Sequence, residues 1–147
     1  EGPGKNEAKL GRPFVGPAGY KLMQWFDMIG LKREEVFLTN AVKCLSNPAP
    51  KPESIERCRD MVLSELKAVK PVLTVLLGDV ALKSVCPTLS VSIGAVRGKM
   101  LWDGERVYLA LFHPAAALHK PELDRELKAD FLQVPVALAK ALAMRGE

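Results

Sequence analysis

The sequence predicts a three-layer α/β/α domain with a short central parallel sheet, and three observations support that fold class. Short apolar runs alternate along the chain with longer stretches of helical periodicity. The run at 72–77 is almost uniformly apolar, as in a parallel strand that is covered on both faces. With 147 residues, of which 48% are hydrophobic, the chain has the size and composition of one folded domain. We therefore expect residues 1–147 to form a single α/β domain.

In the first half of the chain, glycines and prolines mark the ends of the elements. Residues 1–16 are rich in glycine, proline and lysine, so we expect a loop there. Residues 17–29 predict a helix, because apolar side chains recur at helical spacing after a proline and before a glycine. Residues 36–40 are apolar and β-branched and predict a strand. A proline-rich loop at 47–52 then precedes a helix predicted over 53–69.

The second half repeats this alternation after the strand at 72–77. A short helix is expected over 80–85, and residues 87–106 predict a turn-rich segment with a hairpin-like Asp-Gly turn. Residues 107–112 predict another strand. The rest, from 122 to about 143, predicts one long helix that Pro135 kinks.

Composition narrows the classes of partner and compartment. Lysine and arginine number 21 against 17 acidic residues, and the net charge of +4 favours a polyanionic partner. The three cysteines are too few for a disulfide framework, so we expect a reducing compartment, the cytoplasm. No apolar run reaches the roughly 18 residues of a membrane span, so the sequence predicts none.

The topology predicts where a ligand would bind. In parallel α/β sheets, ligands bind beyond the carboxyl ends of the strands. The loops after residues 40, 77 and 112 and the glycine-rich opening are therefore the candidate site. Because that opening resembles a loop that follows a strand, we expect the first strand of the sheet to lie upstream of residue 1.

Three residues in these loops could act on a ligand, and each also has an interpretation without a functional role. His113 follows a strand and precedes a proline, so it could donate a hydrogen bond to developing negative charge, or be a loop histidine without a role. The amide of Asn40 could read one edge of a base or close an Asx-turn. Phe14 could stack on a base or pack under its own loop.

Basic residues and cysteines occur in the same segments. Cys44 and Cys58 are two of the about four ligands that zinc or an iron–sulfur cluster needs, so they are either half a metal site or ordinary cysteines. The basic side chains could contact phosphates or form solvated surface. They are Lys5, Lys9, Arg12, Lys43 and Lys120.

Four stretches of the chain occur in the order of a known set of motifs. Residues 1–4, Glu-Gly-Pro-Gly, and residues 112–115, Phe-His-Pro-Ala, resemble its two signature motifs. Residues 11–19 resemble the stretch with a base-stacking phenylalanine, and residues 38–44 the strand with a pyrimidine-reading asparagine and a cluster cysteine. Together they resemble the uracil-DNA glycosylase superfamily, most closely the iron–sulfur-containing family-four enzymes of bacteria and archaea.

This resemblance implies a base-excision DNA-repair enzyme that hydrolyses the N-glycosidic bond of flipped-out deoxyuridine, releasing uracil and leaving an abasic site. His113 would hydrogen-bond O2 of the departing uracil. Glu1 would position or polarise the attacking water, or offset charge on the sugar. Phe14 would stack on the base, Asn40 would read its edge, and the Gly2 backbone would line the pocket.

The resemblance also implies contacts outside the pocket. Leu118 would be the apolar wedge that enters the duplex, or simply the cap of a helix, and we expect Lys43 and Lys120 at the DNA. Cys44 and Cys58 would be two of the four ligands of a [4Fe–4S] cluster, with the other two upstream. We expect a monomer that acts on uracil in single- or double-stranded DNA. The alternative is a noncatalytic DNA-binding or polymerase-associated module on the same fold.

Overall fold

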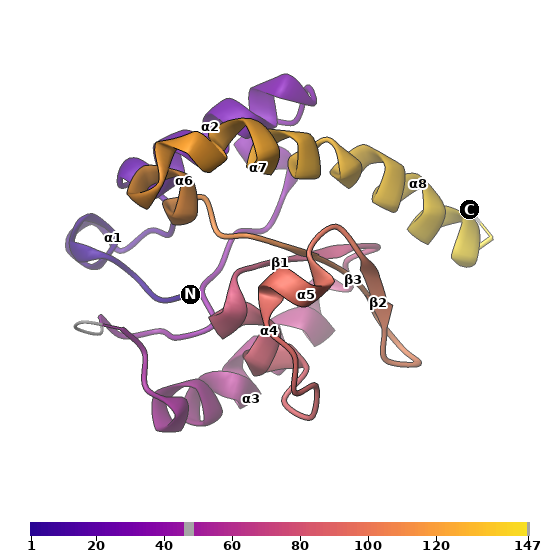
Figure 1. Ribbon diagram of the computed structural model, residues 1–147. Coiled ribbons are helices and arrows are strands. Elements are labelled where there is room, and N and C mark those ends of the chain that lie inside the picture. Colours follow the sequence, from indigo (N-terminus) through magenta and orange to yellow (C-terminus); the bar gives the residue numbers. More distant parts are fainter. Residues whose placement is uncertain (46–48, 147) are drawn as a thin grey trace.

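The sheet lies between two groups of helices in the computed structural model, which describes residues 1–45 and 49–146 (Figure 1). On one side lie α2 (Pro17–Met28), α7 (Asp124–Phe131) and α8 (Gln133–Met144). On the other side lie α3 (Pro52–Val69) and α4 (Asp79–Val85). The predicted α/β class is confirmed.

The sheet is mixed, whereas the sequence predicted a parallel one. Its order is β1-β3-β2. The strand β1 (Thr74–Leu77) runs parallel to β3 (Val107–Leu111), and β2 (Met100–Trp102) runs antiparallel to β3. The prediction is therefore wrong at β2, which lies in the segment expected to be rich in turns. A three-residue strand is too short to show a period in the sequence.

The Asp-Gly turn between β2 and β3 forms the predicted hairpin. One carboxylate oxygen of Asp103 accepts hydrogen bonds from the backbone N–H groups of Glu105 and Arg106 at 2.9 and 2.7 Å. Its other oxygen accepts one from the Tyr108 hydroxyl at 2.8 Å. The side chain of Asp103 thus closes the turn and ties it to the start of β3.

The core consists of two clusters, one on each face of the sheet, because side chains of a strand alternate between its faces. Leu109 and Leu111 of β3 pack with residues of α2, α7 and α8, including Trp25 and Phe131. Tyr108 and Ala110 of the same strand pack with residues of α4 and α5 (Ile93–Val96). Strand β3 is therefore the centre of the fold, and the chain that leaves it begins from a rigid position.

The predicted helices form, with one difference at the C-terminus. The helices expected over 17–29, 53–69 and 80–85 correspond to α2, α3 and α4. The single long helix is wrong, because it consists of a short 3-10 turn, η2 (Pro121–Leu123), followed by α7 and α8. The chain bends at Leu132, since Pro135 has no N–H to bond to the Phe131 carbonyl and its ring crowds that group.

Two predictions near the N-terminus are wrong. Residues 1–16 are not all loop: α1 (Lys5–Leu10) lies within them, ended by Gly11 in the left-handed conformation. Residues 36–40 are not a strand in the described part of the chain, because no ladder pairs them. The backbone N–H of Val42, just beyond them, donates instead to the Glu1 carbonyl at 2.9 Å. Part of the proline-rich loop at 47–52 lies outside the described residues.

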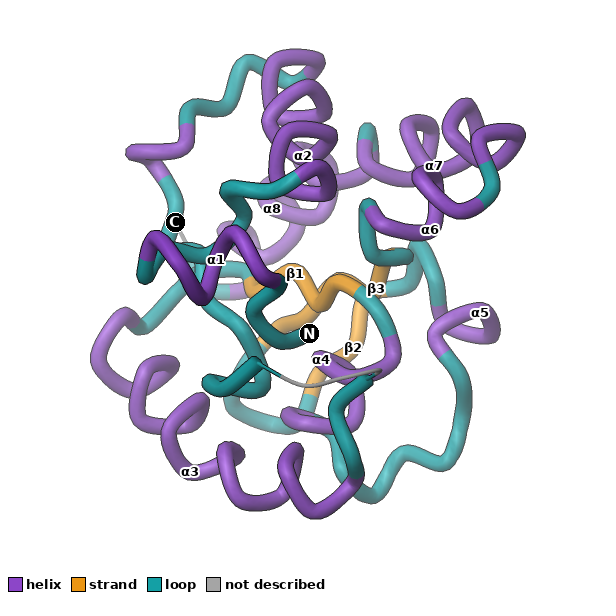
Figure 2. Tube along the Cα trace, turned by 90° about the vertical axis from the view of Figure 1, so that its left-hand side faces the viewer, coloured by secondary structure: helices purple, strands orange, loops and turns teal. Residues whose placement is uncertain are grey.

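The helix α1 lies at one end of the sheet, between α2 and α3, in both views (Figures 1 and 2). The remaining elements are η1 (Arg33–Glu35) and α6 (Ala115–His119). Within the ranges the structure describes, none of the helices is long and apolar enough to cross a membrane.

Candidate active site

A cavity of about 280 Å³ lies where the chain leaves β3, and it joins segments that are far apart in the sequence. Its volume is just below the roughly 300–1,000 Å³ of sites for drug-sized ligands, so the cavity has the size of a site for a small ligand. Six residues that the sequence singled out line it: Gly2, Lys5, Phe14, Asn40, His113 and Leu118.

His113 is held as a neutral hydrogen-bond donor. Its Nδ1 accepts a hydrogen bond from the Ala115 N–H at 3.0 Å, which places the proton of the neutral ring on Nε2. Burial, with a smaller contribution from the positive charge of the Glu1 amino group, lowers the pKa of His113 to about 3. At neutral pH the imidazole is therefore uncharged, and its Nε2–H is available to a ligand.

The ring of Phe14 stacks on the ring of His113. The ring centroids are 5.8 Å apart and the ring planes differ by 22°, which is the geometry of a direct aromatic pair. A base between two rings needs about 7 Å, twice a van der Waals contact of about 3.5 Å. The two rings must therefore move apart before a base can stack on this face of Phe14.

The backbone of Phe14 has an uncommon conformation, with φ at +56°. A Cβ on Gly19 would lie 2.0 Å from the Phe14 carbonyl oxygen, so only glycine fits at that position of α2. Arg33 donates to the Phe14 carbonyl at 3.0 Å and also to the Pro13 carbonyl.

Glu7 holds the other side of the same loop. Its carboxylate accepts hydrogen bonds from the N–H of Val15 at 2.7 Å and from the N–H of Gly16. The sequence reasoning missed both Glu7 and Arg33, because Glu7 lies in a segment expected to be loop and Arg33 lies among other charged residues of a polar stretch. The only sequence signal for this part of the loop was Gly19, which belongs to the stretch at 11–19 and packs against the Phe14 backbone.

Gly78, which follows β1, brings Glu1 and His113 together. A Cβ at Gly78 would lie 3.2 Å from the His113 Cβ and 3.3 Å from a Glu1 carboxylate oxygen. With φ at +94°, Gly78 also has a backbone conformation that favours glycine. The Glu1 carboxylate and His113 therefore both lie next to Gly78, although Glu1 is not among the residues that line the cavity. The sequence reasoning used this loop for topology and missed Gly78 as a site residue.

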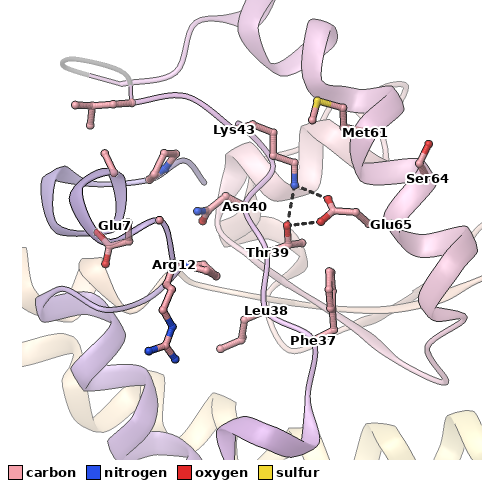
Figure 3. Close-up of a pocket in the computed structure, with 15 residues that line it drawn as sticks. Glu7, Arg12, Phe37, Leu38, Thr39, Asn40, Lys43, Met61, Ser64 and Glu65 are labelled. Atoms are coloured by element: carbon pink, nitrogen blue, oxygen red, sulfur yellow. Dashed lines mark hydrogen bonds and ion pairs between the residues drawn. The ribbon is translucent and has the colours of Figure 1, made fainter.

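A larger cavity of about 740 Å³ adjoins the first, and Glu7 and Asn40 line both (Figure 3). In Figure 3 the Asn40 side chain points toward the side where Glu7 lies, whereas Lys43 points toward α3. Lys43 donates to Thr39 at 2.7 Å and to the carboxylate of Glu65, which also accepts a bond from Thr39 at 2.7 Å. The charge of Lys43 is thus matched by an acidic side chain of α3.

The other expected contact residues differ in their exposure and in whether they line a cavity. Leu118, on α6, is 41% exposed and lines the smaller cavity, and Lys120 follows α6 and is exposed. Cys44 is exposed and Cys58 is half-buried on α3, and neither lines a cavity described above. Among residues 1–45 and 49–146, no three His, Cys, Asp or Glu side chains group closely enough to hold a metal ion. The thiols present here therefore do not fit a complete four-cysteine site.

Known proteins match the chain over most of its length. The family model described as the Uracil DNA glycosylase superfamily matches residues 1–134. The chain is 36% identical over 143 residues to a type-4 uracil-DNA glycosylase of Archaeoglobus fulgidus, covering 91% of the chain and 72% of that protein. It is 38% identical over 144 residues to one of Sulfurisphaera tokodaii, covering 91% and 66%. It is 36% identical over 149 residues to one of Saccharolobus solfataricus, covering 95% and 69%.

Proposed function

We propose a catalytic function from one premise: the chain belongs to the uracil DNA glycosylase superfamily. It is a DNA-repair glycosylase that hydrolyses the N-glycosidic bond of a flipped-out deoxyuridine, releasing uracil and leaving an abasic site. The observation that carries this proposal is the convergence of Phe14, Asn40 and His113 on one cavity.

The pocket binds the extruded base by stacking and by hydrogen bonding. Extrusion of a nucleotide costs a few kcal/mol, and stacking on an aromatic ring such as Phe14 returns roughly 1–3 kcal/mol. The amide of Asn40 pairs with O4 and N3–H of uracil, and the backbone of Gly2 lines the pocket. A cytosine would leave this amide mispaired in a half-buried place, which costs about 1–3 kcal/mol.

The chemical step places negative charge on the departing base. His113 donates its Nε2–H toward O2 of uracil as that charge develops, and one such donor is worth about 10²–10³ in rate. Glu1 orients the water whose oxygen bonds to C1′ while the C1′–N1 bond breaks, or it offsets positive charge on the sugar. The water proton goes to solvent, and the uracil anion is protonated after it leaves.

Two residues near the cavity contact the DNA itself. Leu118 enters the duplex beside the extruded nucleotide, and Lys120 contacts phosphate. Lys43 was also expected there, but its ion pair with Glu65 makes a structural role the better-supported one. We expect a monomer in the cytoplasm that acts on uracil in DNA.

A [4Fe–4S] cluster is a separate part of the proposal. Cys44 and Cys58 would supply two thiolates, and the remaining ligands would have to come from outside the 147 residues described by this sequence. No step above depends on the cluster. Iron and acid-labile sulfide in the full-length protein, compared with its Cys44→Ser and Cys58→Ser variants, would test it.

The activity is tested with oligonucleotides that carry a single uracil, in single and double strands, and with matched thymine and cytosine oligonucleotides. We expect release of uracil alone. Folded protein that releases no uracil from either substrate would contradict the proposal. Salt-dependent binding without preference for uracil would support the noncatalytic alternative.

Replacement of Asn40 by Asp tests the reading of the base. A carboxylate accepts a hydrogen bond from the exocyclic amino group of cytosine, so Asn40→Asp should make cytosine release measurable and lower uracil release by about one to two orders of magnitude. Asn6→Asp is the matched control, because Asn6 lines the same cavity and the change adds the same charge. If Asn40→Asp ignores cytosine while cutting uracil, Asn40 is not the reader.

A further inference from the structure

We propose that Arg33 is a positioning residue for the base-stacking ring. It holds the backbone of Phe14 in the left-handed conformation that directs the ring to the cavity. This inference rests on the proposed function, in which Phe14 stacks on the extruded base. It adds a residue that lines neither of the two cavities described above.

The guanidinium of Arg33 spans two successive carbonyl groups. One terminal nitrogen donates to the Phe14 carbonyl at 3.0 Å, and the other donates to the Pro13 carbonyl. Two carbonyls on one side of a tight turn match the fixed fork of a guanidinium, whereas an ammonium offers no such planar pair of donors. Arg33 is half-buried at the start of η1, so its position is fixed by the fold.

The conformation that Arg33 holds is unfavourable for phenylalanine on its own. A non-glycine residue at φ +56° persists where surrounding contacts fix it. Glu7 binds the N–H groups of Val15 and Gly16, which lie after Phe14, and Arg33 binds the carbonyls at and before it. Phe14 thus lies between two charged side chains that bind the backbone of its loop, the carboxylate of Glu7 and the guanidinium of Arg33.

Loss of the Arg33 guanidinium would leave the turn fixed at one end only. The two carbonyls would lose their shared partner, and Phe14 could relax to the favoured region of negative φ. A rotation of the backbone at that residue moves the ring away from His113, on which it now stacks at 5.8 Å. The contact between the two rings is therefore a direct measure of what Arg33 does.

The first test reads this contact by NMR and does not depend on activity. The stacked ring of Phe14 shifts the ring-proton signals of His113, and the chain has only two histidines, His113 and His119. We expect Arg33→Gln to move the His113 signals in the same direction as Phe14→Ala. Arg33→Lys should do so in part, since it keeps the charge without the fork. Unchanged His113 signals in Arg33→Gln would overturn the proposal.

Arg59→Gln is the matched control. Arg59 also donates to backbone carbonyls, those of Ser84 at 2.9 Å and Lys83 at 3.4 Å, between α3 and α4. Its loss removes bonds of the same kind away from the Phe14 loop. We expect Arg59→Gln to lower the melting temperature about as much as Arg33→Gln does, but to leave the His113 signals and uracil release within twofold of the wild type.

The second test is a double-mutant cycle on uracil release. If Arg33 acts through the ring, Arg33→Gln should lower kcat/KM about tenfold in the wild type and less than twofold in the Phe14→Ala background. Equal effects in both backgrounds would contradict the proposal. The salt dependence of DNA binding should keep its slope, whereas a loss of about 1 would make Arg33 a phosphate contact instead.

The two tests separate this inference from the proposed function. If the wild type releases no uracil but Arg33→Gln still shifts the His113 signals, the proposed function fails and the positioning of Phe14 stands. If the wild type is active and the cycle is additive, only the role of Arg33 fails.

Discussion

Gly78 sets how closely the Glu1 carboxylate can lie beside His113. A side chain there would meet both residues, as its Cβ would lie 3.2 Å from the His113 Cβ and 3.3 Å from the Glu1 carboxylate. Gly104 is a natural comparison, since its φ is also +94° but nothing lies within 4 Å of its added Cβ. A side chain would thus meet the same unfavourable backbone conformation at both glycines, but it would contact other residues only at Gly78.

Gly78→Ala and Gly104→Ala should therefore differ in activity more than in stability. Each should lower the free energy of unfolding by about 1–2 kcal/mol, the cost of left-handed backbone for a residue with a Cβ. Gly78→Ala should also lower the single-turnover rate of uracil release at least about tenfold, because a 1 Å displacement of reacting groups can cost about 10²-fold. Urea unfolding and rapid quench measure the two effects. Equal rates in both variants would show that Gly78 does not position the site.

The neutral, half-buried state of His113 predicts two pH dependences. Its pKa is about 3 in the folded protein and about 6.5 in the unfolded chain, so the unfolded chain binds the extra proton between these values. The contribution of His113 to the free energy of unfolding should thus be level well above pH 6.5 and should fall as the pH drops toward 3. This fall should be smaller in His113→Gln and unchanged in His119→Gln. The profile of kcat/KM should show no inflection near 6.5, and such an inflection in the wild type would mean that His113 titrates normally.

At the residue scale, the sequence could predict side chains that face the ligand but not those that hold them. Phe14, Asn40 and His113 each stand at the end of a recognisable pattern, and the structure places them around one cavity. Arg33 and Gly78 contact groups tens of residues away in the sequence, Arg33 the Phe14 carbonyl and Gly78 the side chain of His113. Their roles depend on tertiary contacts, which no local pattern shows.

At the element scale, the segment at 36–44 depends on helix α3 for its place. It carries Asn40 but pairs with no strand of the described chain. The Thr39 hydroxyl donates to Glu65, and Lys43 donates to both of them. One carboxylate of α3 therefore anchors this segment on both sides of Asn40.

Glu65→Gln should weaken this anchor. We expect a loss of about 1 kcal/mol in the free energy of unfolding, because Lys43 would keep its charge in a half-buried place without an acidic partner. Glu56→Gln, an exposed change on the same helix, should stay within about 0.5 kcal/mol. Urea unfolding measures both. Equal stability in the two variants would mean that the ion pair does not hold the segment.

Sequence patterns predicted the elements best where a long stretch of the chain shows helical periodicity. The helices α2 and α3 have the predicted ends within one residue or so, since proline begins each of them. At the C-terminus, Pro135 was expected to kink one long helix. The structure instead has two helices, which meet at Leu132. Residues 36–40 have the composition of a strand, but a strand exists only where a neighbour completes its hydrogen bonds, and composition does not supply that neighbour.

At the scale of the whole molecule, α1 and α6, which carry residues that line the cavity, lie at one end, and helix α8 ends at the other (Figure 1). The exposed Lys120 directly follows α6. If DNA binds at the cavity, replacing a basic residue near the cavity should change the salt dependence of DNA binding more than replacing one far from it. Lys120→Gln should lower the slope of log K against log salt concentration by about 1. Lys140→Gln on α8 and Lys43→Gln should change it by less than half as much. A slope that is unaffected by Lys120→Gln would place the DNA elsewhere.

The stacked pair of Phe14 and His113 also bears on turnover. While the pocket is empty, the rings of Phe14 and His113 stack on each other. A base that binds between them must replace that contact. An aromatic pair is worth about 0.5–1.5 kcal/mol, so free uracil should bind about two- to tenfold more weakly than it would to rings already apart. The two rings stack again once the free base dissociates. The free energy of this stacking therefore favours product release before the next lesion binds.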